Sequence, residues 1–324
     1  MRALLLDTDG TLSLRVRPRP AIRDECLIRV TAAGICGTDL ELFRGYADFS
    51  GVPGHEFVGV VEEASATDSA WIGRRVVGEI TVGCGQCSAC RAAGRGHCDV
   101  RTVLGIRSRD GAFAEYLSLP ATNLHAVPDS MDDVTAVFVE PVAAACRVVE
   151  QVPIETGTRA AVVGAGRLGL LVAQVLRDRG ADVTVVVRSE VSRSIANTLG
   201  LETVDVDSGP SLARRFDVAV DATGAPAGFA AASALVRPRG TLVVKSTIHG
   251  ETPIAFSPLV VDEITVIGSR CGPFARAIEL LGDDRVEVKP LVAGIHPLEQ
   301  FAEAFDRAKR GLKVILTPGR PRPE

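Results

Sequence analysis

The chain has 324 residues, of which 46% are hydrophobic and 23% charged, and its formal net charge is −4. These totals predict a globular protein of about two domains, and they exclude the basic stripe expected of a nucleic-acid partner. The apolar run near the N-terminus is too short for a signal peptide, and no stretch reaches the ~20 apolar residues of a membrane span. We therefore expect a cytoplasmic protein with no nucleic-acid or membrane partner.

The first 141 residues predict a mainly β domain. Short β-type runs recur there with glycine and proline between them, as at residues 26–31, 57–62 and 75–77. This is the pattern of strands joined by turns.

Side chains that could bind a reactive metal lie at three places in this domain. Cys36 lies in GICGTD, His55 and Glu56 are adjacent in GHEF, and Glu140 precedes a proline at the proposed domain junction. Sulfur, nitrogen and oxygen donors with fewer than four strong ligands are typical of a catalytic zinc that keeps a position for water or substrate. Each residue alone could instead be a core cysteine, a loop histidine or a helix cap. The combination favours zinc.

Four cysteines follow within residues 84–98, spaced C-x2-C-x2-C-x7-C. A disulfide between residues three apart is geometrically awkward, and clustered thiols in a reducing cytosol favour a metal. Four thiolates would fill a tetrahedral shell and leave no position for a substrate. We predict a structural zinc held by Cys84, Cys87, Cys90 and Cys98.

From about residue 142, β runs alternate with helical stretches, which predicts a doubly wound α/β unit. The β runs are rich in valine and continuous, which is typical of a parallel sheet buried on both faces. They comprise residues 159–163, 183–187, 217–221, 241–245 and 264–268. The tail from 272 ends in an apolar run at 313–316, and we expect it to fold back onto the first domain.

A G-x-G-x-x-G motif lies directly after the first of these runs and before a helix. Its glycines are Gly164, Gly166 and Gly169, with Arg167 and Leu168 between the last two. The glycines permit a tight turn and close approach to a pyrophosphate, which faces free N–H groups at the helix start. The alternative is a glycine-rich connector without a ligand.

The end of the next β run bears on the choice of cofactor. Arg188, Ser189 and Arg193 follow it, and the nearest acid, Glu190, lies two residues further. An acid at this strand end would bind the ribose of NAD, whereas arginine suits the 2′-phosphate of NADP. We predict NADP; the alternative is that Arg188 is a solvated charge.

Later strand ends carry further candidates for cofactor binding, because ligands of doubly wound sheets bind at the carboxyl ends of the strands. These candidates are Thr223, Lys245, Ser269 and Arg270. Each could equally be part of an ordinary loop.

In family order, the motifs GICGTD, GHEFVGVV, the four cysteines, DGAFAEY, EP and GAGRLG resemble those of the zinc-dependent medium-chain dehydrogenase/reductase family. The resemblance implies an α/β chain with a GroES-like β-rich catalytic domain and a Rossmann doubly wound parallel-sheet domain, with the active site in the cleft between them. It assigns residues 1–141 to the first, 142–271 to the NADP-binding second, and 272–324 to a C-terminal segment that returns to the catalytic domain.

The resemblance also implies residue roles. Cys36 and His55 match the constant ligands of the catalytic zinc, and Thr38 matches the Ser or Thr that passes on the alcohol proton. Glu56 matches the carboxylate ligand of polyol dehydrogenases, and Glu140 the ligand of the glucose and threonine dehydrogenase branches. Which of the two glutamates is the resting ligand stays open. Glu41 stands where many relatives have a relay histidine.

The expected reaction is hydride transfer between NADP(H) and a secondary alcohol or ketone, most simply a polyol, sugar or cyclitol, with two zinc ions per chain. The alternatives are a simple alcohol or aldehyde reductase, and a non-catalytic protein that senses NADPH. The resemblance implies a homo-oligomer, either a dimer or a tetramer.

Overall fold

The computed structural model describes residues 1–22, 24–248 and 250–319 and divides the chain into two units. The first unit comprises Met1–Glu140 together with the chain from Val292, and the second comprises Pro141–Leu291. Residues 272–291, which were predicted to belong to the C-terminal segment, group with the second unit. Every helix in the described residues is too short or too polar to cross a membrane.

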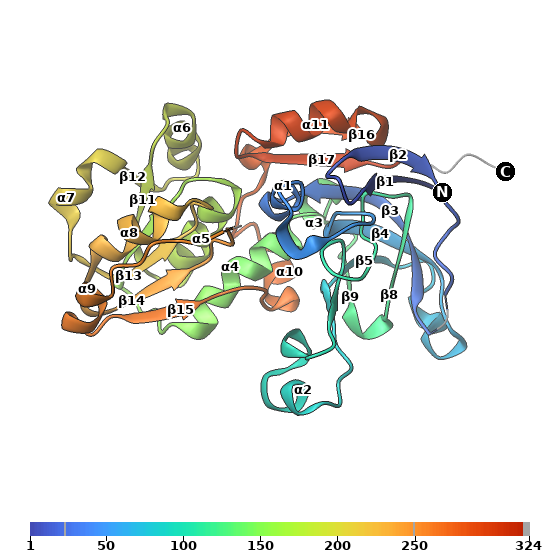
Figure 1. Cartoon of the computed structure of the whole chain (residues 1–324), viewed down its shortest axis with the longest axis horizontal. Coiled ribbons are helices and arrows are strands. Elements are labelled where there is room, and N and C mark those ends of the chain that lie inside the picture. Colours follow the sequence, from blue (N-terminus) through green and yellow to red (C-terminus); the bar gives the residue numbers. More distant parts are fainter. Residues whose placement is uncertain (23, 249, 320–324) are drawn as a thin grey trace. The chain divides into compact units, whose positions relative to one another are not determined.

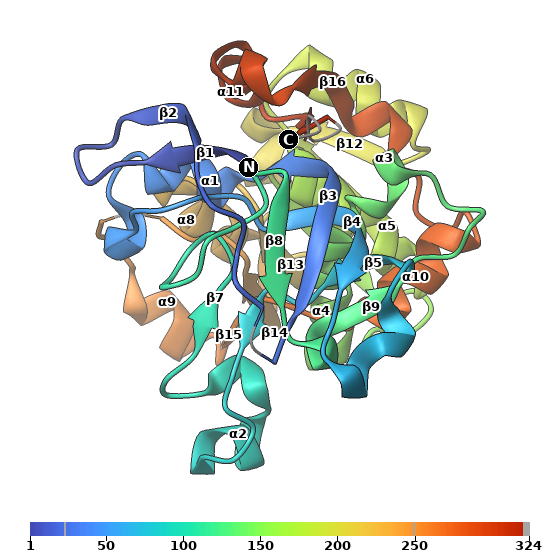
Figure 2. The same ribbon diagram turned by 90° about the vertical axis from the view of Figure 1, so that its right-hand side faces the viewer.

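The first unit is built on a mixed sheet whose strands follow the order β16-β17-β3-β4-β5-β9, with β8 also paired to β3 (Figures 1 and 2). The central strand β3 is almost wholly buried, because it pairs with β4, β8 and β17. The strands of this sheet are β3 (Cys26–Ile35), β4 (Glu56–Glu63), β5 (Arg75–Gly78), β8 (Tyr116–Leu119), β9 (Leu124–Ala126), β16 (Val292–Pro297) and β17 (Lys313–Thr317).

Smaller elements complete the first unit. The four cysteines lie on a lobe around α2 that projects from the sheet in both ribbon views (Figures 1 and 2). The remaining elements are β1 (Arg2–Leu6), β2 (Leu12–Val16), β6 (Thr81–Val82), β7 (Thr102–Val103), α1 (Gly37–Leu42), α2 (Ser88–Ala93), α3 (Asp133–Ala136) and α11 (Phe301–Ala308).

The second unit contains a parallel sheet with the order β12-β11-β10-β13-β14-β15. This is the 3-2-1-4-5-6 order of dinucleotide-binding folds, and it confirms the predicted doubly wound class. The strands are β10 (Arg159–Val163), β11 (Asp182–Val187), β12 (Glu202–Asp205), β13 (Phe216–Asp221), β14 (Val236–Val244) and β15 (Thr265–Gly268).

Helices α5, α6 and α8 pack against the valine-rich strands of this sheet. Helix α5 buries eight consecutive residues from Gly169 to Leu176 and contacts β10 and β11. The helices of this region are α4 (Val139–Gln151), α5 (Arg167–Asp178), α6 (Glu190–Thr198), α7 (Gly209–Leu212), α8 (Pro226–Leu235), α9 (Phe256–Val261) and α10 (Phe274–Gly282).

Candidate active site and metal centres

The mixed-donor site, which we define as Cys36, His55 and Glu56, lies where two antiparallel strands meet. Cys36 directly follows β3, and His55 directly precedes β4, whose first residue is Glu56. Gly34 and Glu56 are partners in the β3–β4 ladder, so the two segments are neighbours. One ligand atom from each of the three side chains lies within 4.8 Å of the other two. The sheet register therefore assembles the donors that the sequence analysis grouped.

A buried carboxylate, Asp39, organises this site. It accepts hydrogen bonds from the N–H of Cys36 at 2.7 Å and from the N–H of Gly54 at 3.3 Å. Its Oδ1 lies 3.4 Å from Nδ1 of His55, an atom that has no hydrogen-bond partner in the described part of the chain. Burial opposes protonation of His55, but the nearby Asp39 and Cys36 raise the pKa of its imidazole well above the ordinary value.

These donors fit a metal ion. A histidine that binds a metal through one nitrogen commonly directs its other nitrogen to a carboxylate, and Asp39 is placed for that role. A thiolate, an imidazole and a carboxylate are the donors of zinc sites that keep an open position. The cation would supply the positive charge that otherwise comes from a proton on His55.

Glu56 has a second partner that the sequence analysis did not predict. Lys313, at the start of β17, forms an ion pair with Oε2 of Glu56, and both side chains are buried, with relative exposures of 0% and 1%. The tail therefore contributes a charged side chain to the mixed-donor site.

Two further predicted residues have different positions. The hydroxyl oxygen of Thr38, on α1, lies 3.8 Å from the sulfur of Cys36. Glu140 lies in the first turn of α4 and does not belong to the group of close ligand atoms found among the described residues. Its role as a ligand remains a prediction.

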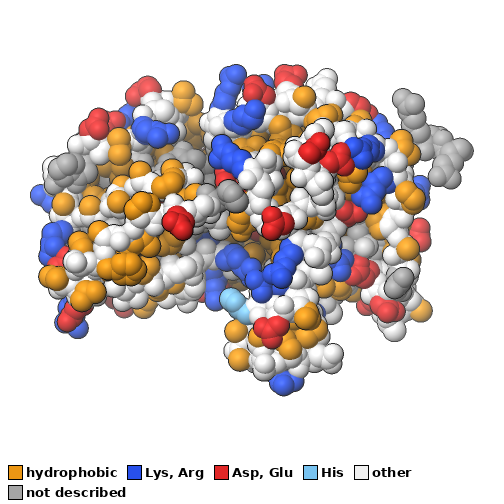
Figure 3. Space-filling view, in the orientation of Figure 1, with side chains coloured by type: hydrophobic (Ala, Val, Ile, Leu, Met, Phe, Trp, Pro, Cys, Tyr) orange, Lys and Arg blue, Asp and Glu red, His pale blue; other side chains and the backbone are white. Residues whose placement is uncertain are grey.

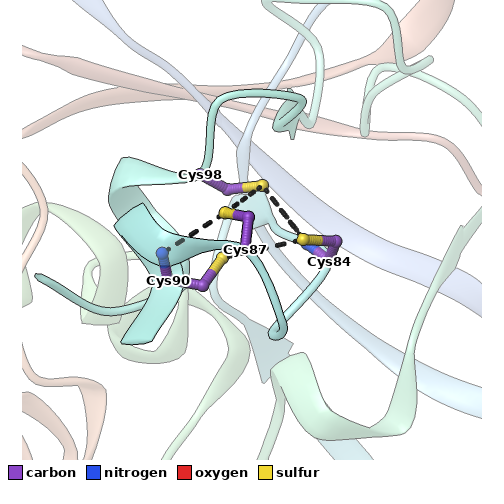
Figure 4. Close-up of side chains that lie close together, drawn as sticks. All are labelled: Cys84, Cys87, Cys90 and Cys98. Atoms are coloured by element: carbon purple, nitrogen blue, oxygen red, sulfur yellow. Dashed lines mark hydrogen bonds between the residues drawn. The ribbon is translucent and has the colours of Figure 1, made fainter. Parts of the chain in front are cut away.

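The four-thiol lobe, residues 84–98, brings its cysteines together without disulfides among the described residues (Figure 4). Sulfur–sulfur distances are 3.6 Å for Cys84 and Cys98, 3.9 Å for Cys87 and Cys98, and 4.0 Å for Cys84 and Cys90. A tetrahedron with zinc–sulfur bonds of ~2.3 Å has edges of about 3.8 Å. The spacing of the sulfur atoms fits a closed tetrahedral zinc.

Backbone hydrogen bonds favour the thiolate form of Cys84 and Cys87, whereas burial raises the pKa of the Cys90 thiol to about 12. The N–H of Cys90 donates to the sulfur of Cys87, and the N–H of Cys84 donates to the sulfur of Cys98, each at 3.4 Å. Hydrogen bonds from the backbone of Gln86 and Cys87 lower the pKa of the Cys84 thiol to about 6. Thiolates are the form that binds a metal.

The glycine motif lies between β10 and α5, as predicted. Gly164 has φ +104°, a conformation that other residues rarely adopt, and Gly166 is the N-cap of α5. A Cβ on Gly169 would lie 1.8 Å from the carbonyl oxygen of Gly164, so helix and turn approach each other as closely as only glycine permits. The N–H groups at a helix start are suited to a phosphate.

Comparison with known proteins agrees with this geometry. Residues 22–129 match the alcohol dehydrogenase GroES-like domain, and residues 168–283 match the zinc-binding dehydrogenase family. L-threonine 3-dehydrogenase of Streptomyces coelicolor is 34% identical over 98% of this chain and 99% of its own length. The chain belongs to the zinc-dependent medium-chain dehydrogenase family. The predicted family and fold class are confirmed.

One further protein and one crystal structure are similar to this dehydrogenase over nearly its whole length. Sorbitol dehydrogenase of Halalkalibacterium halodurans is 29% identical, and the match covers 98% of this chain and 99% of that protein. A crystal structure from Sinorhizobium meliloti 1021, described as a zinc-binding dehydrogenase bound to NADP, has a TM-score of 0.89 and 29% identity. That match covers 98% of this chain and 99% of the other.

The three residues predicted to contact the 2′-phosphate differ in how many hydrogen bonds and ion pairs they already form within the protein. Within the described part of the dehydrogenase, the exposed Arg188 has no hydrogen bond or ion pair. Ser189 caps α6 by accepting the N–H of Ser192. Arg193 forms ion pairs with Asp205 and, at 3.4 Å, with Glu190. Arg188 is therefore the more available guanidinium at this strand end.

The later cofactor candidates make internal contacts. The hydroxyl of Thr223 donates to Oδ1 of Asp221 at 2.8 Å. The buried Nζ of Lys245 donates to the carbonyl oxygens of Ala144 and Arg270, each at 2.8 Å, and lies 3.4 Å from the hydroxyl of Ser269. Lys245 thus links the loop after β15 to α4, and the cofactor roles of this group remain predictions.

Asp39 and Lys313 were not among the predicted site residues. For Asp39 a local signal existed, because an acid three residues after a helix N-cap commonly bonds back to the N-cap N–H, as Asp39 does to Cys36. The sequence signal for Lys313 was weak. This lysine begins the apolar run KVIL, but the sequence does not indicate which strand lies beside that run.

Proposed function

We propose that the chain is a zinc-dependent dehydrogenase that transfers hydride between NADP(H) and a polyhydroxylated secondary alcohol or its ketone. The convergence of Cys36, His55 and Glu56 within 4.8 Å, beside the hydroxyl of Thr38, carries this proposal. The second unit would bind the nicotinamide cofactor through its glycine motif. The four-thiol lobe would hold a second, structural zinc.

The residues in and around the mixed-donor site would have different roles in the reaction. When bound, zinc supplies Lewis acidity toward a hydroxyl or carbonyl oxygen, and the nicotinamide supplies the hydride acceptor or donor. Cys36, His55 and Glu56 would hold the ion, and Asp39 would orient the imidazole. The hydroxyl of Thr38 would take up the proton of the substrate alcohol while it passes its own proton outward, and both transfers would reverse when a ketone is reduced.

The outer path of this proton would differ from that of many relatives. Glu41 lies three residues after Thr38 on α1, with 18% of its side chain exposed, and it pairs with Arg44 at 2.7 Å. A carboxylate would therefore take the place of the relay histidine that many relatives have at this position.

The substrate class rests on the carboxylates. Glu56 lies in the mixed-donor site, and a carboxylate ligand at that position is what the resemblance associates with polyol and sugar dehydrogenases. The similarity to a sorbitol dehydrogenase supports the same class. Only 4% of the residues are aromatic, which disfavours a pocket for aromatic aldehydes.

The preference for NADP rests on the end of β11. No carboxylate occupies the strand end, and the exposed Arg188 has no partner in the described residues. A 2′-phosphate would pair with this guanidinium. The NADP bound to the Sinorhizobium structure supports the proposal.

Metal analysis and a substrate panel test the proposal. We expect two zinc ions per chain, and kcat/KM highest for a polyol or sugar alcohol with NADP rather than NAD. Preference for simple alcohols would instead indicate the reductase. A protein that binds NADPH with only the lobe zinc and no turnover would be a sensor.

We also infer that the chain forms a homo-oligomer through the second unit. Strand β15 is the end strand of its sheet in the described residues, and Val266 on it is 44% exposed. On α9, Phe256, Val260 and Val261 are between 69% and 79% exposed, and Figure 3 shows hydrophobic side chains gathered over this region. A second copy of β15 would cover this edge. Light scattering should show a dimer or tetramer that Val266→Lys dissociates.

A further inference from the structure

Lys245 joins three parts of the second unit. It directly follows β14 and is buried, with a relative exposure of 8%. Its Nζ donates to the carbonyl oxygens of Ala144, on α4, and of Arg270, just beyond β15, each at 2.8 Å. It also lies 3.4 Å from the hydroxyl oxygen of Ser269. One side chain therefore ties the end of β14 to both α4 and the chain that follows β15.

The hydrogen-bonding capacity of this ammonium is taken up by the protein. A lysine side chain has three N–H donors and no acceptor. Two donors are satisfied by carbonyl oxygens, and the hydroxyl of Ser269 lies within reach of the third. A ligand would have to displace one of these internal partners. The geometry therefore favours an indirect role for Lys245 over the direct contact to the cofactor that was predicted from the sequence.

A glycine brings the same stretch of chain against α4. A Cβ on Gly272 would lie 1.9 Å from the carbonyl oxygen of Ala143 and 3.0 Å from Cβ of Arg147, so only glycine lets the backbone lie this near the helix. The side chain of Gln151, the last residue of α4, adds a third contact, because its Nε2 donates to the carbonyl oxygen of Gly268 at 3.1 Å.

These contacts hold one short segment on one face of α4. Ala144, Arg147 and Gln151 are separated by three and four residues, which places them on the same side of a helix. The contacts from this face reach residues 268–272, directly or through the ammonium, and we call these residues the α4-bound segment. The N–H of Ser269 also donates to the carbonyl oxygen of the last residue of β14 at 3.0 Å. The segment is therefore held by both the helix and the sheet.

The place of this segment in the sheet indicates which half of the cofactor it serves. In a dinucleotide fold the ligand lies across the carboxyl ends of the strands, at the point where the strand order reverses. Here that point lies between β10 and β13. The proposed contact of Arg188 to the 2′-phosphate assigns the adenosine half to the side of β11. The nicotinamide half would then lie at the ends of β13, β14 and β15, where the α4-bound segment begins.

We propose that Lys245 is a positioning residue that fixes the α4-bound segment, so that this backbone receives the nicotinamide ring in a single orientation. Lys245 does this without touching the cofactor. This inference rests on the proposed function. It implies that Lys245 matters for binding of the nicotinamide ring and not for binding of the rest of the dinucleotide.

The test compares two ligands of the zinc-loaded enzyme that differ in the ring. NADPH carries the dihydronicotinamide, whereas 2′-phospho-ADP-ribose keeps both riboses and all the phosphates but lacks the ring. Calorimetry would give the Kd of each for the native protein and for Lys245→Met, whose side chain has a similar length but no charge. We expect the Kd of NADPH to rise about ten- to a hundredfold, the range for losing a hydrogen bond to a charged group. The Kd of 2′-phospho-ADP-ribose should stay at its native value. The value of kcat should fall, because a displaced ring loses its alignment for hydride transfer.

Gln174→Met is the matched control. Gln174 is also buried in the second unit, with 1% exposure, and it also ties a helix to a distant segment. It donates to the carbonyl oxygen of Glu287 at 3.0 Å and accepts the N–H of the same residue at 2.8 Å. Its loss should lower the thermal unfolding midpoint, because buried backbone groups lose their partners, yet leave both dissociation constants unchanged.

Gly272→Ala displaces the same segment without altering a charge. The added methyl would push the α4-bound segment away from Ala143, so NADPH should again bind more weakly while 2′-phospho-ADP-ribose should not. Combined with Lys245→Met, it should cost little more than the larger of the two single effects, because both substitutions release the same segment. This variant also carries the test if Lys245→Met does not fold.

Equal losses for the two ligands in Lys245→Met, or no loss for NADPH, would overturn the inference, as would fully additive effects of the two substitutions. Each of these results would leave the proposed function standing, provided that the native enzyme turns over. If the native enzyme prefers NAD, then NADH and ADP-ribose replace the two ligands. A native protein that binds neither dinucleotide would overturn both.

Discussion

In the four-thiol lobe all the donors come from residues 84–98, whereas the mixed-donor site draws on the end of β3, the start of β4 and the start of β17. The lobe donors range from exposed Cys84 to buried Cys98, and local N–H groups contact their sulfur atoms. At the mixed-donor site, distant strands supply the donors and their buried partners. One loop can supply all four ligands of a closed metal site. A metal site that keeps one coordination position open needs further residues, from other parts of the fold, that hold its ligands in place.

The sharpest way to break this comparison is Cys36→Ser. If the mixed-donor site is the reactive one, kcat/KM should fall by about a thousandfold or more, since a catalytic metal contributes several kcal/mol to the barrier. Metal content should fall by one zinc per chain while the lobe zinc remains. Full turnover in a variant that has lost one zinc would show that the two sites had been assigned the wrong roles.

Thr38→Val separates proton transfer from metal binding at the same site. Valine keeps the branched shape but lacks the hydroxyl that lies 3.8 Å from the sulfur of Cys36. Loss of a positioned proton acceptor typically costs about a hundredfold or more in kcat. Zinc content by mass spectrometry should stay at the native level, and a variant that loses zinc would assign Thr38 a structural role instead.

Gly34→Ala tests whether the mixed-donor site depends on close packing. The added methyl would lie 2.5 Å from Oε2 of Glu56, so the ion pair with Lys313 must shift. We expect kcat to change by about tenfold, the effect of about 1.4 kcal/mol at the barrier. Gly94→Ala is the control in the lobe, because nothing lies within 4 Å of its Cβ, although its φ of +84° adds backbone strain. It should leave kcat close to native.

The smallest effect on catalysis is expected for Cys98→Ser in the lobe. Loss of one of four thiolates should release the lobe zinc and lower the thermal unfolding midpoint, because a structural zinc contributes folding energy. At a temperature where the variant stays folded, kcat should fall only a few-fold. The assay pairs metal analysis with calorimetry, and a loss of activity as large as that of Cys36→Ser would contradict the structural role.

Prediction from the sequence was most successful for features formed by residues that are close together in the chain. The four cysteines, the glycine motif and the alternation that leads to β10 through β15 each lie within a short stretch, and the structure has them as expected. Cys36, His55 and Glu56 were grouped from their combination of donor types as well as from the family resemblance, and their ligand atoms do lie close together. Their role as metal ligands remains a prediction.

What could not be predicted depends on pairing between distant strands. Lys313 reaches Glu56 only because β17 pairs with β3, and no local pattern determines that register. The engagement of Arg193 by Asp205 similarly depends on β11 and β12 lying side by side. Lys313 was not predicted and Arg193 was predicted as a cofactor contact. Both side chains form ion pairs with residues on a neighbouring strand, and the sequence does not show which strands are neighbours.

The position of β17 also has a consequence for synthesis of the chain. This strand lies between β16 and β3 in its sheet, yet the ribosome makes it after the entire second unit. The contiguous second unit can fold on the ribosome as soon as it emerges, while the last residues of β3, Ala33–Ile35, wait without their β17 partner. Nascent chains should therefore acquire their nucleotide fold before they have a finished metal pocket, and chaperones that shield unpaired strands would act on the older part of the chain.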